Sequence, residues 1–350
     1  MQARQTHIDA LKLIGSQLIV LHHLSAYGPV ADAVSQAAPG LMRWLYDYAR
    51  MAVQVFLVLG GYLAVQSLMP TGRASTASPG RTLLRRYLRL ALPFMAAMLL
   101  AVACAALARQ WLSADFMPAA PSWGQALAHA LLLHGVLGVD ALSAGVWYVA
   151  IDFQLFALLA LLLWLGYRSG RAIVARALVL GLMTASLFLF NRDAGLDNWA
   201  IYFFGAYGLG AAAHWAARSQ RPAPWLGLLA LLTLLALALD FRTRIALALA
   251  VALLLGGCQW RGITGARLPA WVARPVQALG QASYALFLIH FPLLLLGNAL
   301  FARLGLAGPV AGSAMLLAIW GFSVLLSLWF ERRVEAPLSR LGYRRKLAAQ

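Results

Sequence analysis

The chain has 350 residues, of which 62% are hydrophobic and 11% are charged, whereas soluble domains carry about 25% charged residues. This composition excludes an ordinary soluble enzyme, a disordered chain and a secreted disulfide scaffold, and predicts an all-α polytopic membrane protein with about ten transmembrane helices of about 20 residues each. The net charge of +17 would indicate nucleic-acid binding in a soluble protein, but here we assign it to basic loops that orient the spans, so we expect a lipid bilayer and no nucleic acid as partner.

Apolar runs bounded by Arg, Pro and Gly predict the spans in chain order. They are 9–28, 49–68, 83–107, 146–166, 172–190, 200–217, 224–240, 244–260, 281–302 and 309–330. Residues 122–137, with His129 and His134, form a shorter apolar stretch that we interpret as a helix at the membrane interface. Gly205, Gly208 and Gly210 are typical of close contacts between helices.

Most of the 28 basic residues fall in the junctions on one side of this layout, the side that holds the N-terminus. The positive-inside rule then places both termini in the cytoplasm. We expect one transmembrane domain over residues 1–335 and a basic cytoplasmic tail over 336–350. The two cysteines, Cys104 and Cys258, lack the spacing of metal ligands, and we expect no metal site.

The first span carries the most polar residues, among them Lys12, His22 and His23. Lys12 and His23 lie 11 residues apart, so they share a helix face about 16 Å apart along the axis. This layout suits a long anionic ligand held at one end and reacting at the other. The alternative is that His23 hydrogen-bonds a neighbouring helix while Lys12 extends to lipid phosphate. His22 points about 100° away and is the weaker candidate.

The third span begins with a basic cluster in which Arg86 and Arg89 lie at positions i and i+3. The two side chains therefore share one face, and guanidinium groups bind phosphate with two parallel hydrogen bonds. The alternative is that this cluster only keeps its loop in the cytoplasm.

The fourth span places Asp152 about one turn inside an apolar run, where a carboxylate requires a partner. Asp152 could orient a histidine or bind a cationic group. Trp147 and Tyr148 precede it and are also typical of the aromatic belt of membrane proteins.

In the ninth span, Ser283 and His290 lie seven residues apart on one face. This separation is about 10 Å, which is too far for a hydrogen-bonded nucleophile and base. A hydrogen bond from His290 to a neighbouring helix is the alternative interpretation.

Together and in this order, these motifs resemble the acyltransferase-3 family of integral membrane acyltransferases. The matching segments are Ile8 to Lys12 with His22 and His23, Val55 to Leu63, Arg85 to Pro93, Trp147 to Phe156 and Ser283 to Pro292, and the tail Glu331 to Pro337 also looks like the family's ending. The resemblance covers nearly the whole chain.

The resemblance implies a bundle of about ten helices in a bacterial inner membrane, an acyl-CoA donor in the cytoplasm, and an acceptor hydroxyl on a cell-surface or exported glycan. By the family's spacing, His23 occupies the catalytic position with Lys12, where Arg is usual, as its basic partner. Arg86 and Arg89 match the family's Arg-x-x-Arg pattern. Gly60 stands where Ser is common and Asp152 where Glu is common.

We therefore expect a membrane O-acyltransferase with no permanently bound cofactor, which uses acyl-CoA, in particular acetyl-CoA, as donor. Lys12, Arg86 and Arg89 would hold the CoA phosphates, and neutral His23 would act as general base. An acyl-histidine intermediate is the alternative mechanism.

The remaining candidates have supporting roles in this hypothesis. Asp152 would set the tautomer of His23, and Tyr148 or Tyr284 would stabilise the oxyanion. Trp147 and His290 would complete the substrate site. The alternative function is a proton-coupled transporter or exporter in which His23, Asp152 and His290 form a proton path.

Overall fold

The computed structural model describes residues 6–69, 78–263 and 269–344. Within these ranges the chain is helical and contains no strand. The first half forms α1 (Thr6–Ala26), α2 (Pro29–Ser35), α3 (Pro39–Tyr48), α4 (Val53–Leu68), α5 (Pro79–Ala108), α6 (Trp123–Ala130) and α7 (Trp147–Arg168). The second half forms α8 (Ala172–Phe188), α9 (Ala200–Ala217), α10 (Pro222–Leu239), α11 (Thr243–Trp260), α12 (Ala270–Gln281), α13 (Ser283–Arg303), α14 (Gly308–Phe330) and α15 (Ala336–Arg344).

Every predicted span corresponds to one of these helices, and the prediction of an all-α polytopic membrane protein is confirmed. In the described ranges, eight helices are long and apolar enough to cross a membrane. The other two predicted spans are α1, which carries Asp9 and Lys12, and α9, which is rich in glycine and alanine. Since nearly all residues of α9 are buried by protein, this helix has little need of an aliphatic surface.

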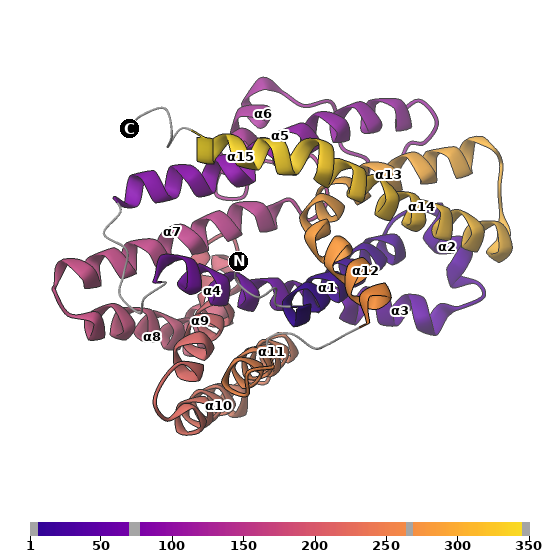
Figure 1. Cartoon of the computed structure of the whole chain (residues 1–350). Helices are drawn as coiled ribbons and strands as arrows, with labels where there is room; N and C mark the ends of the chain where they lie inside the picture. Colours follow the sequence, from indigo (N-terminus) through magenta and orange to yellow (C-terminus); the bar gives the residue numbers. More distant parts are fainter. Residues whose placement is uncertain (1–5, 70–77, 264–268, 345–350) are drawn as a thin grey trace. The chain divides into compact units, whose positions relative to one another are not determined.

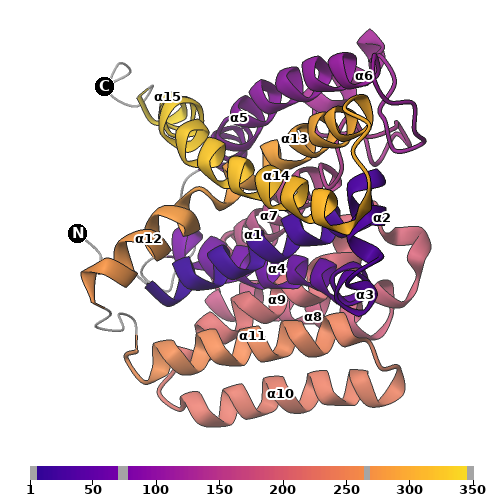
Figure 2. The same ribbon diagram turned by 90° about the vertical axis from the view of Figure 1, so that its right-hand side faces the viewer.

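The helices form two compact units that alternate along the chain. The first unit contains residues 1–8, 53–87 and 149–268, and its central element is α9. Helices α4, α8, α10 and α11 pack against α9, and Figures 1 and 2 show α10 and α11 side by side. The side chain of Gln154 in α7 accepts a hydrogen bond from the backbone N–H of Ala200, the first residue of α9. This bond ties the first half of α7 to the start of α9.

The second unit contains residues 9–52, 88–148 and 269–350. In this unit α13 packs against α14, and α14 packs against α2, as Figure 2 shows. The side chain of Asn298 in α13 accepts a hydrogen bond from the N–H of Val30 in α2. A π-helical turn, Glu331–Glu335, continues α14 into α15. Residues 345–350 of the predicted tail lie outside the described residues.

The predicted interface helix over 122–137 is shorter than expected. Ser122 caps α6 by accepting a hydrogen bond from the N–H of Gln125, but the helix ends at Ala130. Leu132 has a φ of 58°, and a left-handed residue cannot continue a right-handed helix. The imidazole rings of His129 and His134 stack with centroids 4.3 Å apart, so this turn packs the two histidines against each other.

Candidate active site

A pair of buried histidines lies within the second unit. His23, three residues before the end of α1, places its Nδ1 2.7 Å from Nε2 of His290 in α13. The two rings are nearly parallel, with an interplanar angle of 13°. His23 is 8% exposed and His290 1% exposed. The sequence named both residues as candidates but did not predict that they bind each other.

The hydrogen bonds of this pair determine which nitrogens carry protons. Nδ1 of His290 lies 3.0 Å from the carbonyl oxygen of Leu286, which can only accept, so this nitrogen carries the hydrogen. In a neutral His290 ring the other nitrogen, Nε2, is then an acceptor. His23 must therefore donate from its own Nδ1, which leaves Nε2 of a neutral His23 with a free lone pair.

The surroundings of His23 are aromatic and closely packed. Tyr27 and Phe291 lie beside its ring, with centroids 6.0 and 6.3 Å away. Gly145 adopts a φ of 80°, and a Cβ on this residue would lie 3.4 Å from Cε1 of His23 and 3.3 Å from the ring of Phe287. Sequence reasoning missed Gly145 and Phe287, because a glycine and a phenylalanine in an apolar chain carry no chemical signal.

His22 faces a different neighbour, as the helix geometry predicted. Its Nδ1 donates to the carbonyl oxygen of Leu45 over 3.3 Å, and its ring lies beside that of Tyr46. His22 is thus bound to α3 through a backbone carbonyl, whereas His23 is bound to another imidazole.

The serine of the ninth span does not activate His290. Both ring nitrogens of His290 have other partners, the carbonyl of Leu286 and Nδ1 of His23. This observation agrees with the helix geometry, which places Ser283 too far along α13 for a hydrogen bond.

Asp152 lies in the first unit, where its carboxylate binds the guanidinium of Arg86 over 2.5 Å. The same guanidinium lies over the ring of Phe156, 5.1 Å from its centroid. Tyr207 of α9 is fully buried near this ion pair, and its hydroxyl interacts electrostatically with both charges. Asp152 therefore has a cationic partner, which was one of the two roles expected for it, and its influence on the tautomer of His23 stays a prediction.

Lys12 and Arg89 lie in the second unit and share an acidic neighbour, Glu335. Both side chains interact electrostatically with the carboxylate of Glu335, next to the N-terminal end of α13. Oε2 of Glu335 is buried without a hydrogen-bond partner among the described residues. The sequence listed Glu335 only as part of the tail motif and gave no reason to place it beside the two cations.

The three aromatic candidates have different neighbours. The Tyr284 hydroxyl donates a hydrogen bond to the carbonyl oxygen of Leu90 over 3.0 Å. Tyr148 packs edge-on against Phe287, whose ring also lies beside that of His290. Trp147 packs edge-on against Tyr148. Tyr148 is therefore connected to the histidine pair through one phenylalanine, whereas the Tyr284 hydroxyl is bound to the backbone of α5.

Comparison with known families gives one result. The family model described as an acyltransferase domain, acyltransferase-3, matches residues 6–332. The chain shows no significant match to a curated protein or to a solved structure. The match contains α1 with His23, α7 with Asp152 and α13 with His290.

Proposed function

The chain belongs to the acyltransferase-3 family and is a multi-pass membrane acyltransferase, and from this premise we propose that it transfers an acetyl group from cytoplasmic acetyl-CoA to a hydroxyl group of a cell-surface or exported glycan. In this proposal the protein resides in a bacterial inner membrane, and His23 acts as general base.

The observation that carries the proposal is the hydrogen-bonded series Leu286–His290–His23. A general base needs an unprotonated nitrogen directed at the substrate and a fixed ring orientation. The series supplies the fixed ring orientation and the unprotonated nitrogen, because His290 binds Nδ1 of His23 and leaves the lone pair on Nε2.

The proposed reaction proceeds by direct transfer. Nε2 of His23 takes the proton of the acceptor hydroxyl while the hydroxyl oxygen attacks the thioester carbon. The C–S bond then breaks, the ester remains on the acceptor, and the imidazolium returns the proton to the leaving thiolate. General-base catalysis of this kind contributes about 10²–10⁴-fold. The hydrogen bond to His290 would stabilise the transient charge on His23.

The basic candidates support a phosphorylated donor. Lys12 and Arg89 both interact electrostatically with the carboxylate of Glu335, which also interacts with that of Glu331. Arg86 is paired with Asp152 and lies over the ring of Phe156. In the proposal these cations lie on the cytoplasmic side, where the donor enters, and Tyr148 stabilises the oxyanion.

The test is a transfer assay with purified protein in lipid nanodiscs, radiolabelled acetyl-CoA and a glycan acceptor. His23→Ala is expected to abolish transfer, because it removes the base. His22→Ala is the matched control, because the ring of His22 is hydrogen-bonded to the carbonyl oxygen of Leu45 and not to His290. This variant should retain most activity. Equal activity of both variants, with both folded by size-exclusion chromatography, would refute the proposal.

The same preparation separates direct transfer from an acyl-histidine intermediate. Labelled acetyl-CoA without acceptor should leave no label on the protein if transfer is direct. Label that is found on the wild-type protein but not on His23→Ala would indicate an acyl-histidine intermediate instead of general-base catalysis.

A further inference from the structure

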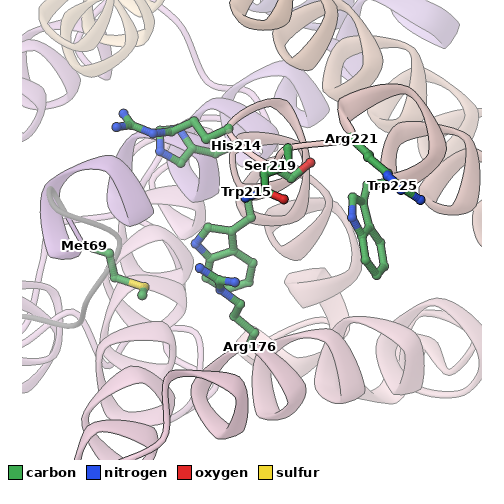
Figure 3. Close-up of a pocket in the computed structure, with 9 residues that line it drawn as sticks. Met69, Arg176, His214, Trp215, Ser219, Arg221 and Trp225 are labelled. Atoms are coloured by element: carbon green, nitrogen blue, oxygen red, sulfur yellow. The ribbon is translucent and has the colours of Figure 1, made fainter.

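A cavity of about 580 Å³ lies within the first unit (Figure 3). Its wall comes from Arg176 of α8, from His214 and Trp215 near the end of α9, and from Arg218 and Arg221 in the turn that follows. Trp225 in the first turn of α10 completes it. Small-molecule sites have volumes of about 300–1,000 Å³, so this cavity can hold a ligand of moderate size.

The charges of the cavity select an anion. Three guanidinium groups line it, those of Arg176, Arg218 and Arg221, and none of its described lining residues carries a carboxylate. In the part of the chain that the structure describes, none of the three forms an ion pair, whereas Arg86 and Arg242 do. Because guanidinium forks match phosphate oxygens and no acidic side chain competes for them, phosphate is the anion that this group fits best.

Two buried nitrogens of the wall also have no partner. Nδ1 of His214 and Nε1 of Trp215 form no hydrogen bond with any described residue. An indole N–H can only donate, and such buried donors are normally satisfied in a folded protein. The His214 ring is oriented by Tyr62, which packs edge-on against it with centroids 5.0 Å apart and donates to Gln259. An oxygen-rich ligand would accept a hydrogen bond from the Trp215 N–H, which the described residues leave unpaired.

The aromatic side chains favour a ligand with a flat ring. Trp225 is 54% exposed, and Figure 3 shows its indole and that of Trp215 on the same cavity as the arginines. Indoles stack on nucleobases and contribute about 1–3 kcal/mol per base. A lipid headgroup offers the phosphate but no ring.

We propose that this cavity is a nucleotide site, in which Arg176, Arg218 and Arg221 bind phosphate groups and an indole stacks on the base. We identify the bound nucleotide as that of the acyl-CoA donor, and this identification rests on the proposed function. It places the phosphates of the donor on Arg176, Arg218 and Arg221 in place of Lys12, Arg86 and Arg89, which have acidic neighbours of their own.

The test is equilibrium binding of free CoA, which carries no acyl group, to the full-length protein in nanodiscs of neutral lipid. Arg218→Gln and Arg221→Gln should each weaken binding by about tenfold, as expected for the loss of a charge-assisted contact. Trp225→Leu should weaken the binding of CoA more than that of inorganic pyrophosphate, since only CoA has a base. The matched control is Arg171→Gln, an exposed arginine that does not line the cavity, and it should bind CoA like wild type.

Other outcomes would overturn the inference. Equal CoA affinity of wild type and all cavity variants would place the nucleotide elsewhere. If the cavity variants instead lose retention of phosphatidylglycerol from mixed-lipid nanodiscs while CoA binding is unchanged, the cavity binds a headgroup. His23→Ala separates the two proposals: if binding depends on the cavity but transfer survives His23→Ala, only the proposed function fails.

Discussion

The two ring nitrogens of His23 are chemically different because His290 binds only one of them. His290 in turn is oriented by the carbonyl of Leu286, one turn earlier in the same helix. A backbone carbonyl in a helix cannot change its role from acceptor to donor, so the proton positions follow from helix geometry. At the scale of single residues, the tautomer of His23 is therefore set by an acceptor outside the first helix.

His290→Leu is expected to lower kcat about 10²-fold, because Nδ1 of His23 loses its acceptor and the tautomer with a free Nε2 is no longer favoured. His290→Gln should recover much of this loss, since its amide oxygen can accept from Nδ1. The measurements are kcat and KM, with ¹⁵N NMR of labelled histidine to identify the tautomer. If the Leu and Gln variants lose activity equally, His290 serves only packing.

At the scale of elements, α9 owes its central position to small residues. A Cβ at Gly210 would collide with the backbone carbonyl of Val58 in α4, and one at Gly208 would lie 2.7 Å from Cβ of Met183 in α8. Gly61 of α4 approaches the backbone carbonyl of Tyr207 in the same way. The expected helix-packing role of Gly205, Gly208 and Gly210 is thus confirmed, and the close contact between α4 and α9 brings Tyr207 next to Gly60 and the Asp152 carboxylate.

Gly210→Ala should lower the thermal unfolding temperature of the purified protein, because the backbones of α4 and α9 must separate to admit the methyl group. A cost of about 1–3 kcal/mol is typical of overpacking. Gly227→Ala is the matched control, since a Cβ at this position in α10 has no neighbour within 4 Å. Equal unfolding temperatures of the two variants would contradict the packing argument.

The segment between α5 and α7 should open as pH falls. Burial, with a smaller effect of His129, lowers the pKa of His134 to about 4 from its ordinary value of 6.5. When the segment opens, His134 recovers its ordinary pKa and takes up a proton, so stability is complete above pH 6.5 and is lost as pH falls towards 4. Between pH 7 and pH 5 the loss is about 2 kcal/mol.

Hydrogen exchange of residues 123–146 at pH 7 and pH 5 measures this loss, after correction for intrinsic exchange rates. Faster opening at pH 5 is expected in wild type and should be much reduced in His134→Phe, whose ring preserves the stacking without titrating. Opening that is independent of pH in wild type would contradict the assigned cause.

At the scale of the whole molecule, the chain passes repeatedly between two compact units, and one helix can contribute residues to both units. Residues 79–87 of α5 belong to the first unit and the remainder of α5 to the second. Arg86 and Arg89 are therefore assigned to different units although three residues separate them. Residues that lie close together along one helix thus acquire different partners, Asp152 for Arg86 and Glu335 for Arg89.

The predicted orientation places the turn between α7 and α8 in the cytoplasm and the turn between α8 and α9 outside. In a variant without native cysteines, Asp197→Cys should react with a membrane-impermeant maleimide in intact spheroplasts, whereas Ser169→Cys should react only after lysis. Both residues are in turns between helices, so access to the reagent is the main difference. The opposite labelling pattern would show that the predicted orientation is inverted.

The class of protein and the position of the apolar helices follow from the sequence alone, and the sequence also proposes His23 as the reactive histidine. These properties depend on local quantities: apolar runs long enough to cross a bilayer, charges at their ends, and an 11-residue spacing between Lys12 and His23. Each can be evaluated within one segment without knowledge of its neighbours. The helix end at Ala130 was not predicted, because leucine rarely adopts the left-handed backbone conformation that Leu132 has. The residue type therefore gives no sign of it.

Which polar groups meet depends on how the helices pack in three dimensions. His23 and His290 are separated by 267 residues, Arg86 and Asp152 by 66, and no periodicity in either segment specifies the partner. A buried polar group requires a partner of complementary chemistry, but several candidates satisfy that requirement equally in the sequence. The packing of the helices selects among them, and the proton positions at His23 follow from that selection.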